Sequence, residues 1–316
     1  MKQAHRILLA AAALGALALP AALVSAQTAA PYTIVETGQT FPRLQLAVDA
    51  IGNGAGTIRI APGRYGDCAI QADGDVLYSA TPGTVVFDSM ICEGKAALVL
   101  RGRSARVEGL TFANLRVPDG NGAGIRLEKG SLSVTQSWFK DSEEGIITGD
   151  NPAGTIAIDK STFTRLGRCD RGLSCAHSIY TGDYGALTVT RSRFEAGRGG
   201  HYVKTRAGRV AVLASSFDDS AGRTTNYMID LSAGATGRIT NNWFLQGSDK
   251  ENYSAFIAIG AEGHAHSADG LSIDANDARY APGVERKSAF VADWTGDRLA
   301  MGSNALAQGL TRYERR

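Results

Sequence analysis

Short stretches of alternating apolar and polar residues recur along the chain between residues 105 and 244. Each ends in a polar residue or two and then phenylalanine, and subtraction gives spacings of 27, 24, 31, 23 and 27 residues between successive phenylalanines. Self-similarity at a period of about 20–50 residues is typical of a solenoid, whose units bury a face only by stacking on their neighbours. The phenylalanines are predicted to stack as an internal ladder of Phe112, Phe139, Phe163, Phe194, Phe217 and Phe244.

A second series of short apolar segments runs in step with the first, from GIRL at residue 124 to FIAI at residue 256. These segments are too short and too rich in β-branched residues for helical hairpins, so strands are predicted. Alternate residues of a strand face opposite ways, which separates an inward column from an outward one. The inward column is Ile125, Ile146, Ile179, Val203, Ile229 and Ile257. The outward column is Arg126, Ile147, Tyr180, Lys204, Asp230 and Ala258.

Coils of about 23–31 residues with two or three short strands describe a parallel β-helix, which predicts one domain over residues 27–316. Ahead of the coils, FPRLQLAVDAIGNGAG places Leu44, Ala47, Val48 and Ile51 on one helical face and stops at glycines, as a cap over the first open coil would. The cap is expected at about residues 40–52 and the coils at about 56–262. Residues 263–316 are expected to form final coils or a tail.

The run LQLAVDAIGNGAGTIRIAPGRYGDCAI resembles the start of the pectate-lyase-like right-handed β-helix superfamily, whose members often open with an amphipathic cap helix, a strand and an apGrY turn. The resemblance implies an all-β, right-handed parallel β-helix. It does not select a reaction, because that fold hosts lyases, hydrolases, epimerases, esterases and non-catalytic adhesins. The calcium-binding acidic cluster of many pectate lyases is missing, and no metal or other cofactor is predicted.

The first 26 residues have the pattern of a secretory signal peptide. Lys2 and Arg6 precede a long apolar run, and small residues ending at Ala26 fit a cleavage site. This predicts a periplasmic or secreted protein, and no later stretch reaches the ~20 apolar residues of a membrane span. Removing two of the 33 basic residues leaves 31 against 31 acidic ones. A balanced charge disfavours nucleic acid as a partner.

All four cysteines follow this leader, in a part of the chain where disulfides can form. Cys68 is predicted to pair with Cys92, and Cys169 with Cys175 across the short polar loop CDRGLSC. The absence of a CxxC pair leaves little support for a zinc site.

Two pairs of residues 24 apart point to a site shared by neighbouring coils: Tyr180 with Lys204, and His177 with His201. Stacked strands in this register would hold each pair about 4.8 Å apart. Strand parity also sends Tyr202 and Arg206 outward beside Lys204.

The alternative is a surface without function. Lys204 would then form an exposed ion pair with Asp230, contributing about 0–1 kcal/mol, and the histidines would cap turns.

The functional interpretation is an acidic polysaccharide as partner and β-elimination as reaction. Elimination needs a cation on the uronic acid carboxylate, a base near the adjoining ring carbon and an acid for the departing oxygen. The planar fork of Arg206 suits the carboxylate. Lys204 is the candidate base, and Tyr180, His177 and His201 are candidate acids. The candidate substrate-binding residues are Arg206, Tyr202, Asp230, Asn226, Asn252 and Glu262.

Other functions stay open on sequence alone. A uronan C5-epimerase needs much the same residues, and a non-catalytic polysaccharide-binding or envelope protein is the alternative from another class. Hydrolysis is less well supported, because a glycosidase needs two placed carboxylates. The outward column offers only Asp230, with Asp218 and Asp219 in the adjoining turn.

Overall fold

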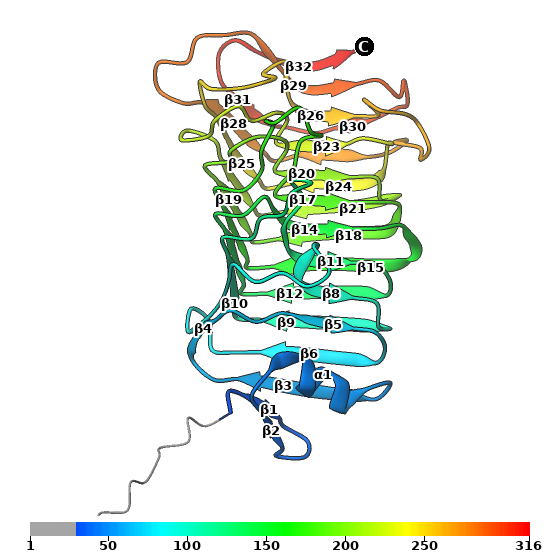
Figure 1. Cartoon of the computed structure of the whole chain (residues 1–316). Helices are drawn as coiled ribbons and strands as arrows, with labels where there is room; N and C mark the ends of the chain where they lie inside the picture. The colour runs from blue at the N-terminus through cyan, green and yellow to red at the C-terminus, as the bar shows by residue number, and fades with distance from the viewer. Residues whose placement is uncertain (1–29) are drawn as a thin grey trace, which may run out of the picture.

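The computed structural model describes residues 30–316, so the predicted signal peptide lies outside the described residues. The chain winds into a stack of coils whose strands form three long sheets, as in a parallel β-helix (Figure 1). The strands continue beyond residue 262 and reach Arg315, so the carboxyl-terminal segment adds further coils. Among residues 30–316, no helix is both long and apolar enough to cross a membrane.

Sheet A has twelve strands, parallel except at its first end, where β1 pairs antiparallel with both β2 and β3. In spatial order they are β2 (Thr40–Phe41), β1 (Tyr32–Ile34), β3 (Ala55–Ile60), β6 (Asp75–Ser79), β9 (Ser104–Glu108), β12 (Ser131–Thr135), β15 (Asn151–Asp159), β18 (Tyr184–Thr190), β21 (Arg209–Leu213), β24 (Thr236–Thr240), β27 (Ser272–Asp274) and β30 (Ala300–Met301).

Sheets B and C have ten parallel strands each. Sheet B contains β4 (Gly63–Tyr65), β7 (Val85–Asp88), β10 (Leu110–Ala113), β13 (Trp138–Lys140), β16 (Thr162–Thr164), β19 (Arg193–Glu195), β22 (Ser216–Asp218), β25 (Trp243–Gln246), β28 (Asp277–Tyr280) and β31 (Ala305–Leu306). Sheet C contains β5 (Ala69–Gln71), β8 (Ala96–Leu100), β11 (Ala123–Leu127), β14 (Glu144–Thr148), β17 (Ile179–Thr181), β20 (Val203–Thr205), β23 (Ile229–Leu231), β26 (Ala255–Ile259), β29 (Ser288–Asp293) and β32 (Leu310–Arg315).

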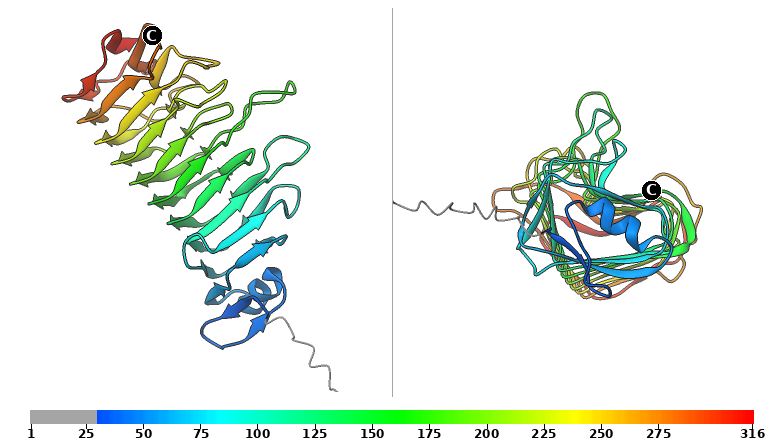
Figure 2. Two further views of the ribbon diagram at one scale, coloured as in Figure 1. Left: turned by 90° about the vertical axis from the view of Figure 1, so that its left-hand side faces the viewer. Right: turned by 60° about the horizontal axis from the view of Figure 1, so that its bottom comes forward.

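The single helix among residues 30–316, α1 (Leu44–Ile51), lies over the amino-terminal end of the stack (Figure 2, right). Its apolar face buries Leu44, Ala47 and Val48. The Asp67 carboxylate accepts a 2.8 Å hydrogen bond from the Leu44 backbone N–H, which supplies a partner for one of the free N–H groups at the helix start. Gly52 ends the helix with a φ of 57°, a conformation that glycine adopts without strain.

The predicted phenylalanine ladder is present in sheet B. Successive rings pair in register from Phe112 to Phe244, and their centroids lie 4.8–5.0 Å apart. Phe87 extends the ladder by one coil. One ring of each coil packs on the ring of the next, so the ladder fixes how the strands of sheet B stack. Each coil also contributes to sheets A and C, whose strands therefore stack with the same order of coils.

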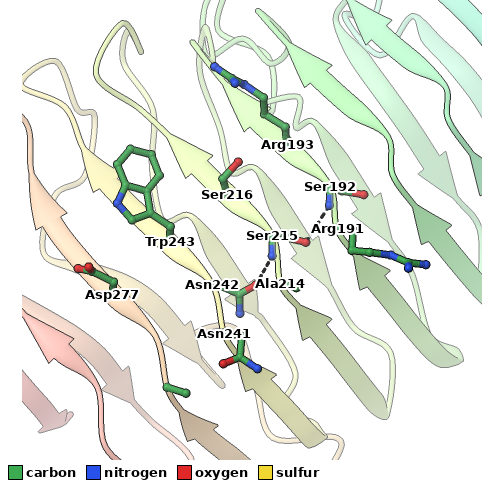
Figure 3. A pocket seen from close by; sticks show the side chains of 11 residues that line it. Arg191, Ser192, Arg193, Ala214, Ser215, Ser216, Asn241, Asn242, Trp243 and Asp277 are labelled. Atoms are coloured by element: carbon green, nitrogen blue, oxygen red, sulfur yellow. Dashed lines mark hydrogen bonds between the residues drawn. The ribbon is translucent and has the colours of Figure 1, made fainter.

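A second ladder, of serine and asparagine, closes the turn between sheets A and B. The Ser192 N–H donates to Ser215 Oγ at 3.1 Å and the Ser215 N–H to Asn242 Oδ1 at 3.0 Å, as the dashed lines in Figure 3 show. The Asn242 N–H continues the series to Asn276 at 3.0 Å. These buried backbone groups lie outside the sheet ladders, so each coil supplies a side chain that satisfies its neighbour.

Both predicted disulfides are present. Cys68 is bonded to Cys92 and Cys169 to Cys175, with Cα–Cα distances of 5.6 and 4.4 Å. The second bond closes the loop between β16 and β17, and Arg168 braces that loop by donating to the Ser174 carbonyl at 2.9 Å. This loop therefore has a fixed shape where it borders the outward face of sheet C.

Candidate functional site

A cleft of about 530 Å³ opens on the outward face of sheet C, where β14, β17 and β20 lie side by side. Connections between strands build its walls: one brings Asn121, the disulfide loop brings Ser174 and Cys175, and the loop after β26 brings Glu262. Figure 2 shows loops standing out from the otherwise regular stack. The remaining lining residues are Glu144, Ile147, His177, Tyr180, His201, Lys204 and Arg206.

One column of side chains at the floor of the cleft comes from successive coils. His177 and His201 each lie two residues before the paired positions Ile179 and Val203, and their rings stack with centroids 4.9 Å apart. The His201 backbone N–H donates to His177 Nδ1 at 3.0 Å. Tyr227 continues the column, with its ring centroid 5.5 Å from that of His201.

Tyr202 does not belong to the cleft, contrary to the parity argument. It is 1% exposed, and its hydroxyl donates to Asp219 Oδ1 at 2.7 Å inside the coil. Two consecutive residues point inward at this position of the coil, as with Tyr202 and Val203 and again with Phe256 and Ile257, all of which lie in the core. Simple alternation therefore holds from Val203 onward but fails one residue earlier.

Lys204 and Arg206 face the cleft as predicted. The Lys204 side chain is almost fully buried, at 6% exposure, and its Nζ lies 2.8 Å from Asp230 Oδ2. Asp230 itself is buried beneath the cleft, where it also accepts a 2.7 Å hydrogen bond from Ser232 Oγ. Asp230 therefore holds Lys204 from below, whereas the sequence interpretation had it facing substrate.

Glu262 lies across both cations. Its carboxylate forms ion pairs with Lys204 and Arg206, and Arg206 also donates to the Tyr180 hydroxyl. The loop that carries Glu262 folds back over the coil because the Glu262 N–H donates to the Ser232 carbonyl at 3.0 Å. A carboxylate is thus held between an ammonium and a guanidinium at the mouth of the cleft.

The two predicted asparagines lie away from the cleft lining. Asn226 donates to Glu251 and accepts the Tyr227 N–H at 2.8 Å. Asn252 accepts the Ser254 N–H at 2.9 Å. Both side chains fix the local backbone, a structural role that their position in the sequence does not reveal.

Two further histidines of the Glu262 loop pair with different acids. His264 Nε2 lies 3.0 Å from Asp297 Oδ2, and His266 Nε2 lies 3.1 Å from Asp183 Oδ1. Among residues 30–316, no group of three or more His, Cys, Asp or Glu side chains is placed to hold a metal ion. The contacts made by this pair anchor the loop.

Burial sets the protonation states in the cleft. It lowers the pKa of His177 and His201 well below 6.5, helped in both cases by the nearby charge of Lys204. Burial raises the pKa of Glu144 well above 4.5. Both effects disfavour the charged form of the group. The floor of the cleft therefore presents neutral imidazoles and a carboxyl group with a raised proton affinity.

Glu144 is an ionisable cleft residue that the sequence interpretation missed. It lies two residues before Ile146, as His177 lies two before Ile179, and it pairs with Ala123 of the preceding coil. The signal was present: aligning EEGIIT with HSIY and HYVK puts Glu144 in the histidine column. Glu144 lies outside the outward column, which has Ile147 at this coil.

A second hollow, of about 500 Å³, lies at the border of sheets A and B and differs in character (Figure 3). Its charged residues, Arg191, Arg193 and Asp277, are at least partly exposed and are paired with Asp159, Glu195 and Arg279. It lacks the buried ionisable groups that mark the cleft on sheet C. The cleft on sheet C is therefore the better candidate for chemistry.

In comparisons with known proteins, no family model matches the chain, and no curated protein or solved structure is significantly similar to it. The function is consequently argued from the geometry of the cleft.

Proposed function

We propose that the protein binds an acidic polysaccharide in the cleft on sheet C and cleaves it by β-elimination. The observation that carries the proposal is a carboxylate held by two cations beside neutral imidazoles. Glu262 is bound there by Lys204 and Arg206, and the pKa of His201 is lowered by burial at the floor of the same cleft. Proton abstraction next to a carboxylate requires cations that stabilise the developing negative charge and a base that takes the proton, and the cleft offers both kinds of group.

The carboxylate subsite is the position that Glu262 occupies. Its side chain is 45% exposed and comes from a loop, so a uronic acid carboxylate can take its place against Lys204 and Arg206. An arginine fork and an ammonium together bind the carboxylate and stabilise the negative charge that develops when the neighbouring carbon loses its proton. Glu262 acts in the free protein as an internal stand-in for substrate.

His201 is the best-placed base. Its Nε2 lies 3.5 Å from Asp230 Oδ2, which favours a proton on Nε2 and leaves Nδ1 with the lone pair. That Nδ1 is buried and has no hydrogen-bond partner among residues 30–316, so a small rotation of the ring must bring it to the substrate. His177 differs, because its Nδ1 already accepts the His201 N–H. Lys204, the base expected from sequence, is ion-paired with two carboxylates and serves as a cation.

The test is formation of unsaturated product from a panel of uronic acid polysaccharides, followed by its ultraviolet absorbance. Arg206→Ala is expected to raise KM by about 10–100-fold, because a hydrogen bond to a charged group contributes about 1.5–3 kcal/mol. Arg193→Ala is the matched control, since Arg193 lies on sheet B and lines the other hollow. Binding without product on every substrate would refute elimination, and proton exchange in heavy water would then separate an epimerase from a binding protein.

Glu262→Gln tests the stand-in role. Removing the internal carboxylate takes away the group that competes with substrate for both cations, so KM for the polysaccharide is expected to fall by about threefold or more, with kcat little changed. Asp269→Asn, in the same connection but not an ion-pair partner of Lys204 or Arg206, is the control. A rise in KM on Glu262→Gln would mean that Glu262 contacts substrate directly.

A further inference from the structure

Glu144 is a buried carboxyl group at the cleft that the proposal so far does not use. It is 2% exposed, it belongs to the cleft lining, and its Oε2 has no hydrogen-bond partner among residues 30–316. Leaving a buried polar atom without a partner costs about 1–3 kcal/mol, and more for a charge. Such an atom in a native structure calls for an explanation, and a catalytic role is one of the recognised ones.

The neighbouring Glu143 shows what a structural carboxylate looks like in this fold. It is equally buried, but its Oε2 accepts the N–H groups of Val117 and Gly122 at 2.8 and 2.9 Å, and its Oε1 pairs with Arg171 at 2.6 Å. These contacts tie a connection and the disulfide loop to β14. Glu144, one residue on and facing the cleft, holds no loop in this way.

Four groups facing Glu144 determine its charge besides burial. The His177 backbone N–H, Arg126 and Arg168 favour the carboxylate, whereas Glu143 opposes it. Desolvation outweighs the three favourable contributions, so the pKa is raised well above 4.5. Arg126 compensates little for the lost hydration of the Glu144 carboxylate, because its Nε also lies 3.7 Å from Glu128 Oε1. Glu144 is therefore suited to enter a reaction as a carboxylic acid.

We propose that Glu144 is the catalytic acid of the elimination and gives its proton to the departing glycosidic oxygen. This assignment rests on the proposed function. Glu144 and His201 flank His177 in one column, two coils apart, which corresponds to about 10 Å along the stack. Both side chains line the same cleft, so each can reach the reacting end of a sugar unit that lies against the column over His177.

The proton and electron balance closes without any other reactant. His201 Nδ1 takes the proton from the carbon next to the carboxylate. The electron pair of that bond forms the carbon–carbon double bond, and the bond from the next carbon to the glycosidic oxygen breaks. The oxygen leaves with the proton of Glu144. Imidazolium and carboxylate remain, and one proton returned from His201 to Glu144 through solvent restores the starting state.

The experiment compares Glu144→Gln with wild-type protein on two substrates: a polysaccharide, and a uronide whose leaving group is a nitrophenol. A nitrophenol leaves without protonation, so loss of the acid is expected to reduce its kcat by less than tenfold while reducing kcat on the polysaccharide by about 10²–10⁴-fold. The alkaline limb of the pH profile should also disappear. Glu195→Gln, a carboxylate of β19 on sheet B that pairs with Arg193 and lies outside the cleft lining, is the control.

A direct readout accompanies the kinetics. The infrared C=O band of a protonated carboxyl group is expected in wild-type protein at pH values above 4.5, where an ordinary glutamate is already ionised, and is expected to be lost in Glu144→Gln. Equal losses on both substrates, or none, would overturn the assignment of Glu144 while leaving elimination in place. If wild-type protein forms no unsaturated product from either substrate, the proposed function fails and the role of Glu144 fails with it.

Discussion

His201→Gln is expected to lower kcat for elimination by about 10²–10⁴-fold, the usual contribution of a positioned general base. The amide keeps much of the volume of the ring but cannot take up a proton, so folding and substrate affinity should change little. Single-turnover formation of unsaturated product measures the chemical step directly. Tyr227→Phe keeps the stack on His201 and removes only a hydroxyl group, which makes it the control. Undiminished kcat in His201→Gln would remove His201 from the mechanism.

The pH dependence provides an independent check on the same residue. Burial lowers the pKa of His201 well below 6.5, so the imidazole is neutral near neutral pH and the acid limb of kcat is expected below pH 6.5. His201→Gln should lack that limb. The unfolded chain binds the proton near pH 6.5, whereas the folded chain resists it. Stability from this group is thus present above pH 6.5 and is lost as the pH falls.

Lys250→Met is expected to lower the free energy of unfolding by about 3–5 kcal/mol, because it leaves a buried carboxylate without its cation. Lys250 Nζ lies 3.1 Å from Asp219 Oδ2, and both side chains are fully buried. Asp219 also accepts hydrogen bonds from Tyr202 and from Thr225, so its charge lies at the centre of an internal polar network. Denaturant unfolding followed by circular dichroism measures the loss.

The matching double variant, Lys250→Met with Asp219→Leu, removes both charges together. It is expected to recover part of the loss, since a buried pair replaced by apolar residues is often nearly neutral. The recovery is incomplete because the Tyr202 hydroxyl loses the acceptor of its proton and keeps only the hydrogen bond from the Gly197 N–H. A loss below about 1 kcal/mol in Lys250→Met would show that the pair behaves like a surface ion pair, contrary to its burial.

The coils were predictable because their signal repeats. One phenylalanine per coil and one β-branched residue per coil fix the register of two sheets, and the structure has both columns where the spacings place them. Tyr202 was misplaced because two inward residues in succession break the alternation. A tyrosine is compatible with either face, so its identity gave no warning. The fold was therefore more accessible from sequence than the orientation of residues just outside the strands.

Most of the site could be predicted where its residues recur at the spacing of the coils. Lys204, Arg206 and Tyr180 follow from register, and His177 and His201 from their equal spacing. Contacts made by connections carry no periodic signal. The buried Lys250–Asp219 pair and the wall formed by the disulfide loop depend on how irregular segments pack, which the repeat does not encode.

Successive coils each supply side chains to the cleft lining, so the whole coil is the unit by which this architecture can grow or shrink. Insertion or deletion of a single residue in a strand would move the following side chains of that strand from the solvent face to the core face, as a register slip does in any sheet. Gain or loss of an entire coil would keep every column aligned and change only the number of coils in the stack. The length of the cleft along the stack can therefore change only in steps of one strand spacing, about 4.8 Å. Such a scaffold can be matched to longer or shorter polymer segments without rebuilding its core.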